Sequence, residues 1–87
     1  MISHIMFRFD GQVALVTGAG NREGIGFATA RILGQLGAQV ALAATTDRIY
    51  DRAGELESLG ISAKGYIADL MKEEEVEGLV QQILWDF

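Results

Sequence analysis

An apolar run that leads into a glycine-rich turn constrains the fold of this chain more than any other feature. Residues 13–26 read VALVTGAGNREGIG, and a helical pattern begins at the end of this stretch. Glycine allows tight turns and lets the backbone approach a ligand closely. The free N–H groups and the positive dipole at the start of a helix favour an anion. This order of strand, glycine turn and helix therefore predicts a phosphate-binding site for a nucleotide.

The order of strand and helix is repeated three times along the chain. Apolar runs predict strands at residues 13–17, 40–44 and 63–68. Helical spacing predicts helices at residues 25–36, from a cap at residue 46 or 47 to residue 60, and from about residue 72 onward. The first two strands are apolar at successive positions, which is typical of strands buried on both faces of a parallel sheet. The alternation predicts an α/β fold of the Rossmann type, here a partial parallel sheet with strand order 3-2-1 and three helices.

Local signals indicate the ends and the buried sides of these helices. Gly37 and Gly60 follow helices, where a left-handed backbone is common. Thr46 or Asp47 can cap the second helix with a side-chain oxygen. Apolar spacing predicts one buried side for the first helix, formed by Ile25, Ala28, Ile32, Leu33 and Leu36.

The predicted topology leaves the apolar first strand at an edge of the sheet. Right-handed crossovers that proceed in one direction place the first two helices on the same face of the sheet, so only the third helix covers the other face. The strand at residues 13–17 is then an apolar edge, which is a site of association unless other structure covers it. We therefore expect a homo-oligomer, association through this edge, or a truncated part of a longer protein. Residues 1–10 are predicted to be an N-terminal extension, and residues 11–87 the cofactor-binding half of a Rossmann domain.

Composition and charge exclude several classes of partner. The net charge of −5 argues against nucleic acid as the main partner. The chain has no cysteine and one histidine, His4, so no metal site is predicted. No apolar run approaches the roughly 20 residues of a membrane span, and the N-terminus lacks the features of a secretory signal. We therefore expect a cytoplasmic protein that binds no membrane.

The glycine turn resembles that of a known family. Thr17 and Gly18, followed by Gly24, Ile25 and Gly26, are similar to the TGxxxGIG turn of the short-chain dehydrogenase/reductases. The stretch at residues 36–40 and the Asp-Leu pair at residues 69–70 resemble the same family, with the bacterial 3-oxoacyl-acyl-carrier-protein reductases most alike. The loop has five residues between the first two glycines of the motif where three are usual. That length is similar to the divergent enoyl-acyl-carrier-protein reductases, which stay an alternative.

The resemblance implies a role for each residue of a dinucleotide site. Three glycines would shape the turn, the N–H of the first helical residue would lie near the pyrophosphate, and the loop would face the adenosine ribose. An aspartate after the third strand would accept from the adenine amino group, beside the backbone of the next residue. The three glycines are Gly18, Gly24 and Gly26, and the first helical residue is Ile25. The loop residue is Asn21, Arg22 or Glu23, and the aspartate and the residue after it are Asp69 and Leu70.

The end of the second predicted strand bears on the choice of cofactor. NAD-selective members of such folds carry an acid there, which binds the ribose hydroxyls. This chain has Ala44 followed by Thr45, so nothing acidic repels a 2′-phosphate and a hydroxyl can donate to it. Arg22 or Arg48 could add positive charge. These residues favour NADP(H); NAD(H) stays possible through Asp47, which we interpret as a helix cap.

The residues that the family uses for catalysis are not found in this stretch. The resemblance implies a Ser, a Tyr and a Lys in a YxxxK arrangement, but Tyr50 is followed by Gly54 and Tyr66 by Leu70. No catalytic residue is therefore predicted. The chain is expected to be the NADP(H)-binding portion of an oxidoreductase that, when complete, transfers hydride between a nicotinamide cofactor and a carbonyl or hydroxyl substrate. The alternative is a non-catalytic nucleotide-binding or oligomerising module.

Overall fold

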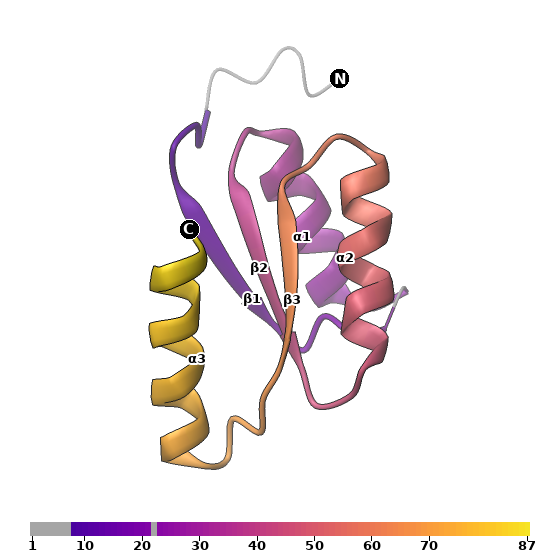
Figure 1. Ribbon diagram of the computed structural model, residues 1–87. Coiled ribbons are helices and arrows are strands. Elements are labelled where there is room, and N and C mark those ends of the chain that lie inside the picture. Colours follow the sequence, from indigo (N-terminus) through magenta and orange to yellow (C-terminus); the bar gives the residue numbers. More distant parts are fainter. Residues whose placement is uncertain (1–7, 22) are drawn as a thin grey trace.

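The computed structural model describes residues 8–21 and 23–87 (Figure 1). Three strands alternate with three helices: β1 (Val13–Thr17), α1 (Ile25–Gln35), β2 (Gln39–Ala44), α2 (Arg48–Ser58), β3 (Ala63–Ile67) and α3 (Glu73–Asp86). These bounds agree with the predicted strands and helices to within about two residues.

The three strands form one parallel sheet in the order β1-β2-β3, which confirms the predicted topology. β2 lies in the centre: Leu42 is opposite Val16 of β1 on one side and opposite Gly65 of β3 on the other. The carboxyl ends of all three strands therefore lie at the same end of the sheet (Figure 1). In open α/β sheets, ligands bind outside this end.

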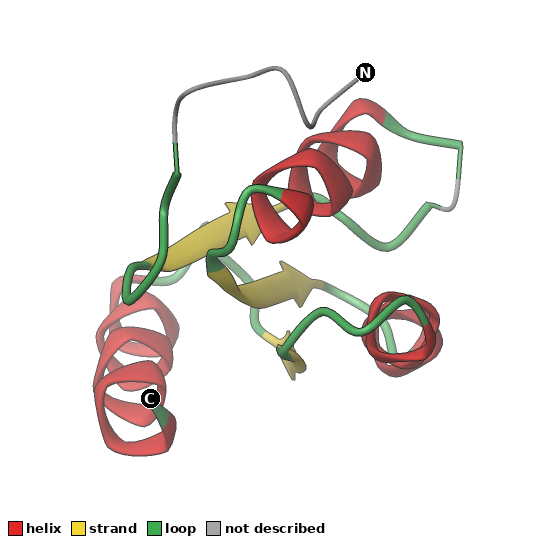
Figure 2. Ribbon diagram, turned by 90° about the horizontal axis from the view of Figure 1, so that it is seen from above, coloured by secondary structure: helices red, strands yellow, loops and turns green. Residues whose placement is uncertain are grey.

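α1 and α2 cover one face of the sheet and enclose the larger core (Figure 2). Val40 and Leu42 of β2 are fully buried there, together with Ile49 and Leu56 of α2. Burying one such side chain contributes about 1.5–3 kcal/mol, so these four fix α2 on the sheet.

α1 packs through a side that matches the predicted one only in part: Leu36 is buried and Leu33 packs against the core, but Ile32 is exposed. Ile25 is 86% exposed, whereas Phe27 and Ala30 are buried. The packed side is selected by close approach, because Gly34 lies where a Cβ would collide with the side chain of Ile61. The prediction counted apolar residues and overlooked the small ones that let the helix approach its neighbours.

α3 covers the opposite face of the sheet, which presents small side chains (Figure 2). Ala41 and Ala43 of β2 are fully buried and pack with Leu79 and Ile83 of α3. Period-two alternation along β2 explains this division, since successive side chains point to opposite faces. β2 therefore has large residues toward α1 and α2 and alanines toward α3.

β1 is an edge strand that pairs with β2 alone. The expectation that it is buried on both faces is wrong for this chain, since Val13 and Leu15 are each 42% exposed. These two side chains face an open hollow of ≈ 220 Å³ between β1 and α3. We call it the apolar groove; it is lined by Val13, Leu15, Val80, Ile83 and Leu84.

The glycines that follow α1 and α2 have the predicted left-handed backbone, with φ of +104° at Gly37 and +82° at Gly60. Asp47 precedes α2 as predicted, but its side chain makes no capping hydrogen bond. Its backbone is helical, with φ −70° and ψ −7°, whereas a capping residue has an extended backbone that aims its side chain at the helix. The interpretation of Asp47 as a side-chain cap is therefore wrong.

Candidate functional site

The glycine turn between β1 and α1 lies against the end of β2. Gly18 has a left-handed backbone with φ +66°. The N–H of Ala19 donates to the carbonyl of Ala43 over 3.4 Å, and a Cβ at Gly20 would lie 3.2 Å from the Cβ of Ala44. Small residues therefore bring the turn into contact with the strand end.

Asn21 shapes the second part of the turn through two hydrogen bonds. Its Oδ1 accepts from the N–H of Glu23 at 3.0 Å, and its carbonyl accepts from the N–H of Gly24 at 2.9 Å. Gly24 has an extended backbone and is the N-cap of α1. Arg22, which was predicted to face the ribose, lies outside the described residues.

Gly26 lets α1 begin directly beside the turn. A Cβ there would lie 2.8 Å from the carbonyl oxygen of Gly18 and 3.1 Å from that of Thr17. Ile25 is the first residue of α1, and its side chain is largely exposed. Its backbone is therefore the part suited to a ligand, since the first N–H groups of a helix have no intrahelical partner and favour an anion.

A pocket of ≈ 380 Å³ opens at the carboxyl ends of the strands. Five predicted site residues line it: Gly18, Asn21, Thr45, Asp69 and Leu70. Gly24, Ile25 and Gly26 are not part of its wall and instead fix the geometry of the turn and helix start. Sequence reasoning did not assign five other wall residues to the site: Gly20, Ala43, Thr46, Ala68 and Met71. Several of these are small residues at strand ends, a signal that could have been used.

The end of β2 gives the pocket a hydroxyl-rich wall. Ala44 is followed by Thr45 and Thr46, and Arg48 also lines the pocket, whereas Asp47 does not. The Nε of Arg48 donates to Oγ1 of Thr46 at 3.5 Å. This part of the wall therefore has the hydroxyls of Thr45 and Thr46 and the guanidinium of Arg48, but not the carboxylate of Asp47.

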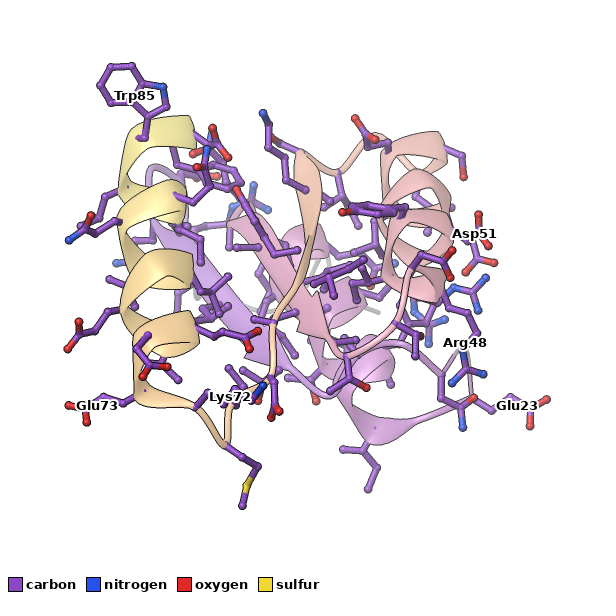
Figure 3. All side chains as sticks on the ribbon, turned by 60° about the horizontal axis from the view of Figure 1, so that its bottom comes forward. Glu23, Arg48, Asp51, Lys72, Glu73 and Trp85 are labelled. Atoms are coloured by element: carbon purple, nitrogen blue, oxygen red, sulfur yellow. The ribbon has the colours of Figure 1, made fainter. Side chains whose placement is uncertain are left out.

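A second, polar hollow of ≈ 280 Å³ shares part of this wall. It is lined by Gly20, Asn21, Glu23, Arg48 and Arg52. The two arginines are four residues apart and so lie on one side of α2. Figure 3 shows Glu23 and Arg48 on the same side of the molecule, so one carboxylate partly offsets the positive charge.

Arg52 is held firmly in this hollow. Its side chain is only 13% exposed, and it forms a 3.1 Å ion pair with Glu55. Its guanidinium also lies 5.9 Å from the centre of the Phe27 ring. Its Nε has no hydrogen-bond partner among the described residues, so this buried donor stays available to a ligand.

The loop after β3 forms the third side of the pocket. The N–H of Asp69 donates to Oε1 of Glu75 at 2.8 Å, and Oδ1 of Asp69 accepts from the N–H of Met71 at 3.0 Å. The carbonyl of Asp69 accepts from the N–H of Lys72, also at 3.0 Å. Sequence reasoning did not assign Glu75 to the site, so its contact with this loop was missed.

The two tyrosines lie elsewhere. Tyr50 and Tyr66 line a separate hollow of ≈ 410 Å³ beside β3. Tyr66 donates a 2.7 Å hydrogen bond to Oδ2 of Asp86, and burial together with this carboxylate raises the pKa of its phenol. The same bond lowers the pKa of Asp86. Neither tyrosine reaches the strand-end pocket.

Residues 8–21 and 23–87 contain neither a metal-binding cluster nor a membrane-spanning helix. This part of the chain contains no group of three or more side chains that could hold a metal ion. None of the helices in the same part is long and apolar enough to cross a membrane.

Comparisons with known proteins agree on one family. The family model described as short chain dehydrogenase matches residues 12–87. The Cα-dehydrogenase of Sphingobium sp. is 40% identical over 67 residues, which are 76% of this chain and 21% of that protein. The 2-dehydro-3-deoxy-D-gluconate 5-dehydrogenase of Formosa agariphila is 38% identical over 80 residues, 90% of this chain and 30% of that protein.

Solved structures of dehydrogenases are also similar to this chain. A citronellol catabolism dehydrogenase of Pseudomonas aeruginosa superposes with a TM-score of 0.84 at 40% identity, over 93% of this chain and 35% of the other. The chain spans between about a fifth and a third of the length of the curated relatives that it matches first. The family model, the relatives and the fold together show that this chain belongs to the short-chain dehydrogenase family.

Proposed function

We propose that residues 11–87 bind NADP(H) as the cofactor-binding half of a short-chain oxidoreductase. The observation that carries the proposal is the end of β2, where Thr45, Thr46 and Arg48 line the pocket and Asp47 does not. An acid at this place would bind the ribose hydroxyls of NAD and repel a 2′-phosphate. Hydroxyls and a guanidinium are donors to a phosphate, so they favour the phosphorylated cofactor.

The residues of the pocket fit the adenosine end of this cofactor. The start of α1 beside the turn at Gly18 is suited to the pyrophosphate, because the first N–H groups of a helix have no intrahelical partner. Asn21 lies beside the ribose, Asp69 accepts from the adenine amino group, and Leu70 offers its backbone. The adjoining polar hollow with Arg48 and Arg52 is suited to the 2′-phosphate.

The nicotinamide of the bound cofactor supplies or accepts a hydride at a carbonyl or hydroxyl carbon. The described residues bind and orient the other end of the molecule, and we assign none of them to the step on the substrate. A related metagenomic short-chain oxidoreductase, 35% identical with a TM-score of 0.81, is described as a complex with NADP, which supports this cofactor class.

Calorimetric titration of the folded chain with NADPH, NADH and ATP tests the proposal. NADPH is expected to bind most tightly. Arg48→Ala should weaken NADPH by about tenfold or more, the value of a hydrogen bond to a charged group, and change NADH by less than about twofold. Arg31→Ala is the matched control, since Arg31 is exposed on α1 and lines neither hollow.

Two results contradict the proposal. Equal weakening of NADPH and NADH by Arg48→Ala would place the arginine away from the 2′-phosphate. No binding of either dinucleotide at millimolar concentration by a folded sample would remove the cofactor role from this chain.

A second candidate is a non-catalytic module that associates through its sheet edge. The apolar groove favours it, because Leu15 is 42% exposed on an edge strand and Leu84 beside it is 74% exposed. Exposed apolar strand edges pair with other chains. Sedimentation or light scattering should then give a dimer, and Leu15→Glu a monomer. Ile67→Glu on β3 is the control, and a monomeric unaltered chain would exclude this candidate.

A further inference from the structure

The loop that carries Asp69 begins where the sheet ends. The N–H of Ala68 donates to the carbonyl of Ala44 at 3.0 Å, which continues the pairing of β2 and β3 by one bond. The next amide, that of Asp69, has left the sheet and donates to Oε1 of Glu75 at 2.8 Å. This bond therefore takes the place of a strand partner at the position where the chain enters the pocket wall.

The other polar groups of Asp69 are tied to the same helix start. Its carbonyl accepts from the N–H of Lys72, and its Oδ1 accepts from the N–H of Met71, both at 3.0 Å. Oδ2 is the carboxylate oxygen that no described residue contacts through a hydrogen bond. The three bonds fix the backbone on both sides of Asp69 and fix the rotation of its side chain, so Oδ2 has a defined direction.

Glu75 is suited to this role by its reach. An acidic residue in the third position of a helix usually turns back to the N–H of the N-cap. Here the N-cap is Lys72, whose N–H is already bonded to Asp69, so the carboxylate extends to the Asp69 amide instead. Its second oxygen lies 3.8 Å from Nζ of Lys72. Glu73 and Glu74 of the same turn are exposed, and Figure 3 shows Glu73 pointing away from the loop.

We propose that Glu75 is a positioning residue for adenine recognition: it holds Asp69 so that one carboxylate oxygen is aimed at the adenine amino group. This inference rests on the proposed function, since it assumes that a dinucleotide occupies the pocket. Glu75 touches no part of the ligand and acts only through Asp69.

Two substitutions separate the reach of Glu75 from its charge. Glu75→Gln keeps the length and an accepting oxygen but removes the negative charge. Glu75→Asp keeps the charge near the helix start but is one methylene too short to reach the amide of Asp69. Glu74→Gln and Glu74→Asp are the matched controls, one residue earlier on the same turn.

The readout is selectivity for the adenine amino group. Each variant is titrated with NADPH and with its hypoxanthine analogue, in which a carbonyl replaces the amino group and cannot donate to a carboxylate. The unaltered chain should prefer NADPH by about tenfold, the value of one charged hydrogen bond. Glu75→Asp should reduce this preference to within about twofold, while Glu75→Gln and both Glu74 variants keep most of it. Hydrogen exchange of the Asp69 amide without ligand should quicken by about tenfold or more in Glu75→Asp alone.

The outcomes distinguish this inference from the proposed function. If the unaltered chain binds neither dinucleotide, the proposed function fails and the inference fails with it. If NADPH is preferred and Glu75→Asp keeps that preference, only the inference is overturned. It is also overturned if Glu75→Gln loses the preference, or if the Glu74 variants lose it as well, because reach would then not be the cause.

Discussion

Replacing Gly26 with alanine tests whether the close approach of α1 to the glycine turn holds the site in shape. The added Cβ would lie 2.8 Å from the carbonyl oxygen of Gly18 and 3.1 Å from that of Thr17. Both are backbone atoms, so no side-chain rotation relieves the contact. α1 must then move away from the turn, and overpacking of this kind costs about 1–3 kcal/mol. Alanine returns up to about 1 kcal/mol through its higher helix propensity, which leaves a net loss of up to about 2 kcal/mol.

Gly54 of α2 and Gly78 of α3 are matched controls for this substitution. Both lie in helix interiors, and a Cβ at either position would meet nothing within 4 Å. Alanine there gains helix propensity without a collision, so the chain should be stabilised by about 0.5–1 kcal/mol. The same chemical change is therefore expected to have opposite signs at Gly26 and at the two controls.

Urea unfolding followed by far-ultraviolet circular dichroism measures these differences. Trp85 is 86% exposed and, as Figure 3 shows, points away from the molecule, so its fluorescence is a poor probe. With an unfolding slope of about 1 kcal/mol per molar urea, Gly26→Ala should lower the midpoint by up to about 2 M. If Gly26→Ala raises the urea midpoint as the control substitutions do, the reasoning is refuted, because α1 would then have space for the added Cβ.

Three further outcomes are expected. Ala44→Asp introduces the acid that binds ribose hydroxyls, so calorimetry should show the preference change from NADPH to NADH. Leu42→Ala empties a fully buried site and should cost about 2–5 kcal/mol in urea unfolding, whereas Trp85→Ala should change stability by less than about 0.5 kcal/mol. Tyr66→Phe removes the hydrogen bond that lowers the pKa of Asp86. A lowered pKa stabilises the fold above the pKa of an unfolded aspartate, about 3.9, so the difference in urea midpoint between the chain and this variant should shrink as the pH falls below that value.

The sequence was sufficient for the order of elements because their boundaries depend on local chemistry. Gly37 and Gly60 mark the ends of α1 and α2 through a left-handed backbone that glycine adopts readily. The buried side of α1 could be predicted only in part. It depends on space in three dimensions, where Gly34 leaves room for Ile61, and apolar spacing made Ile25 a core residue although it is 86% exposed.

The residues of the candidate site were likewise predictable only where their position follows from the order of the strands. Gly18, Thr45 and Asp69 follow strand ends, and parallel strands bring their carboxyl ends together, so sequence order alone indicates that these residues meet. Glu75 could not be found this way. Each of three successive glutamates at a helix start interacts favourably with the helix dipole, so the sequence does not distinguish them. Only the hydrogen bond from the Asp69 amide to the carboxylate of Glu75 does so.

α3 connects the two surfaces that the proposals concern. Its first turn holds the Asp69 loop through Glu75, and its last turns form one wall of the apolar groove through Ile83 and Leu84. Between these ends it packs on the sheet through Leu79, against small side chains that include Ala41 and Ala43. Any structure that covers the groove adds contacts to α3 and so restricts its movement. Adenine selectivity, which depends on a fixed Glu75, should therefore be sharper in an associated form of the chain than in its monomer.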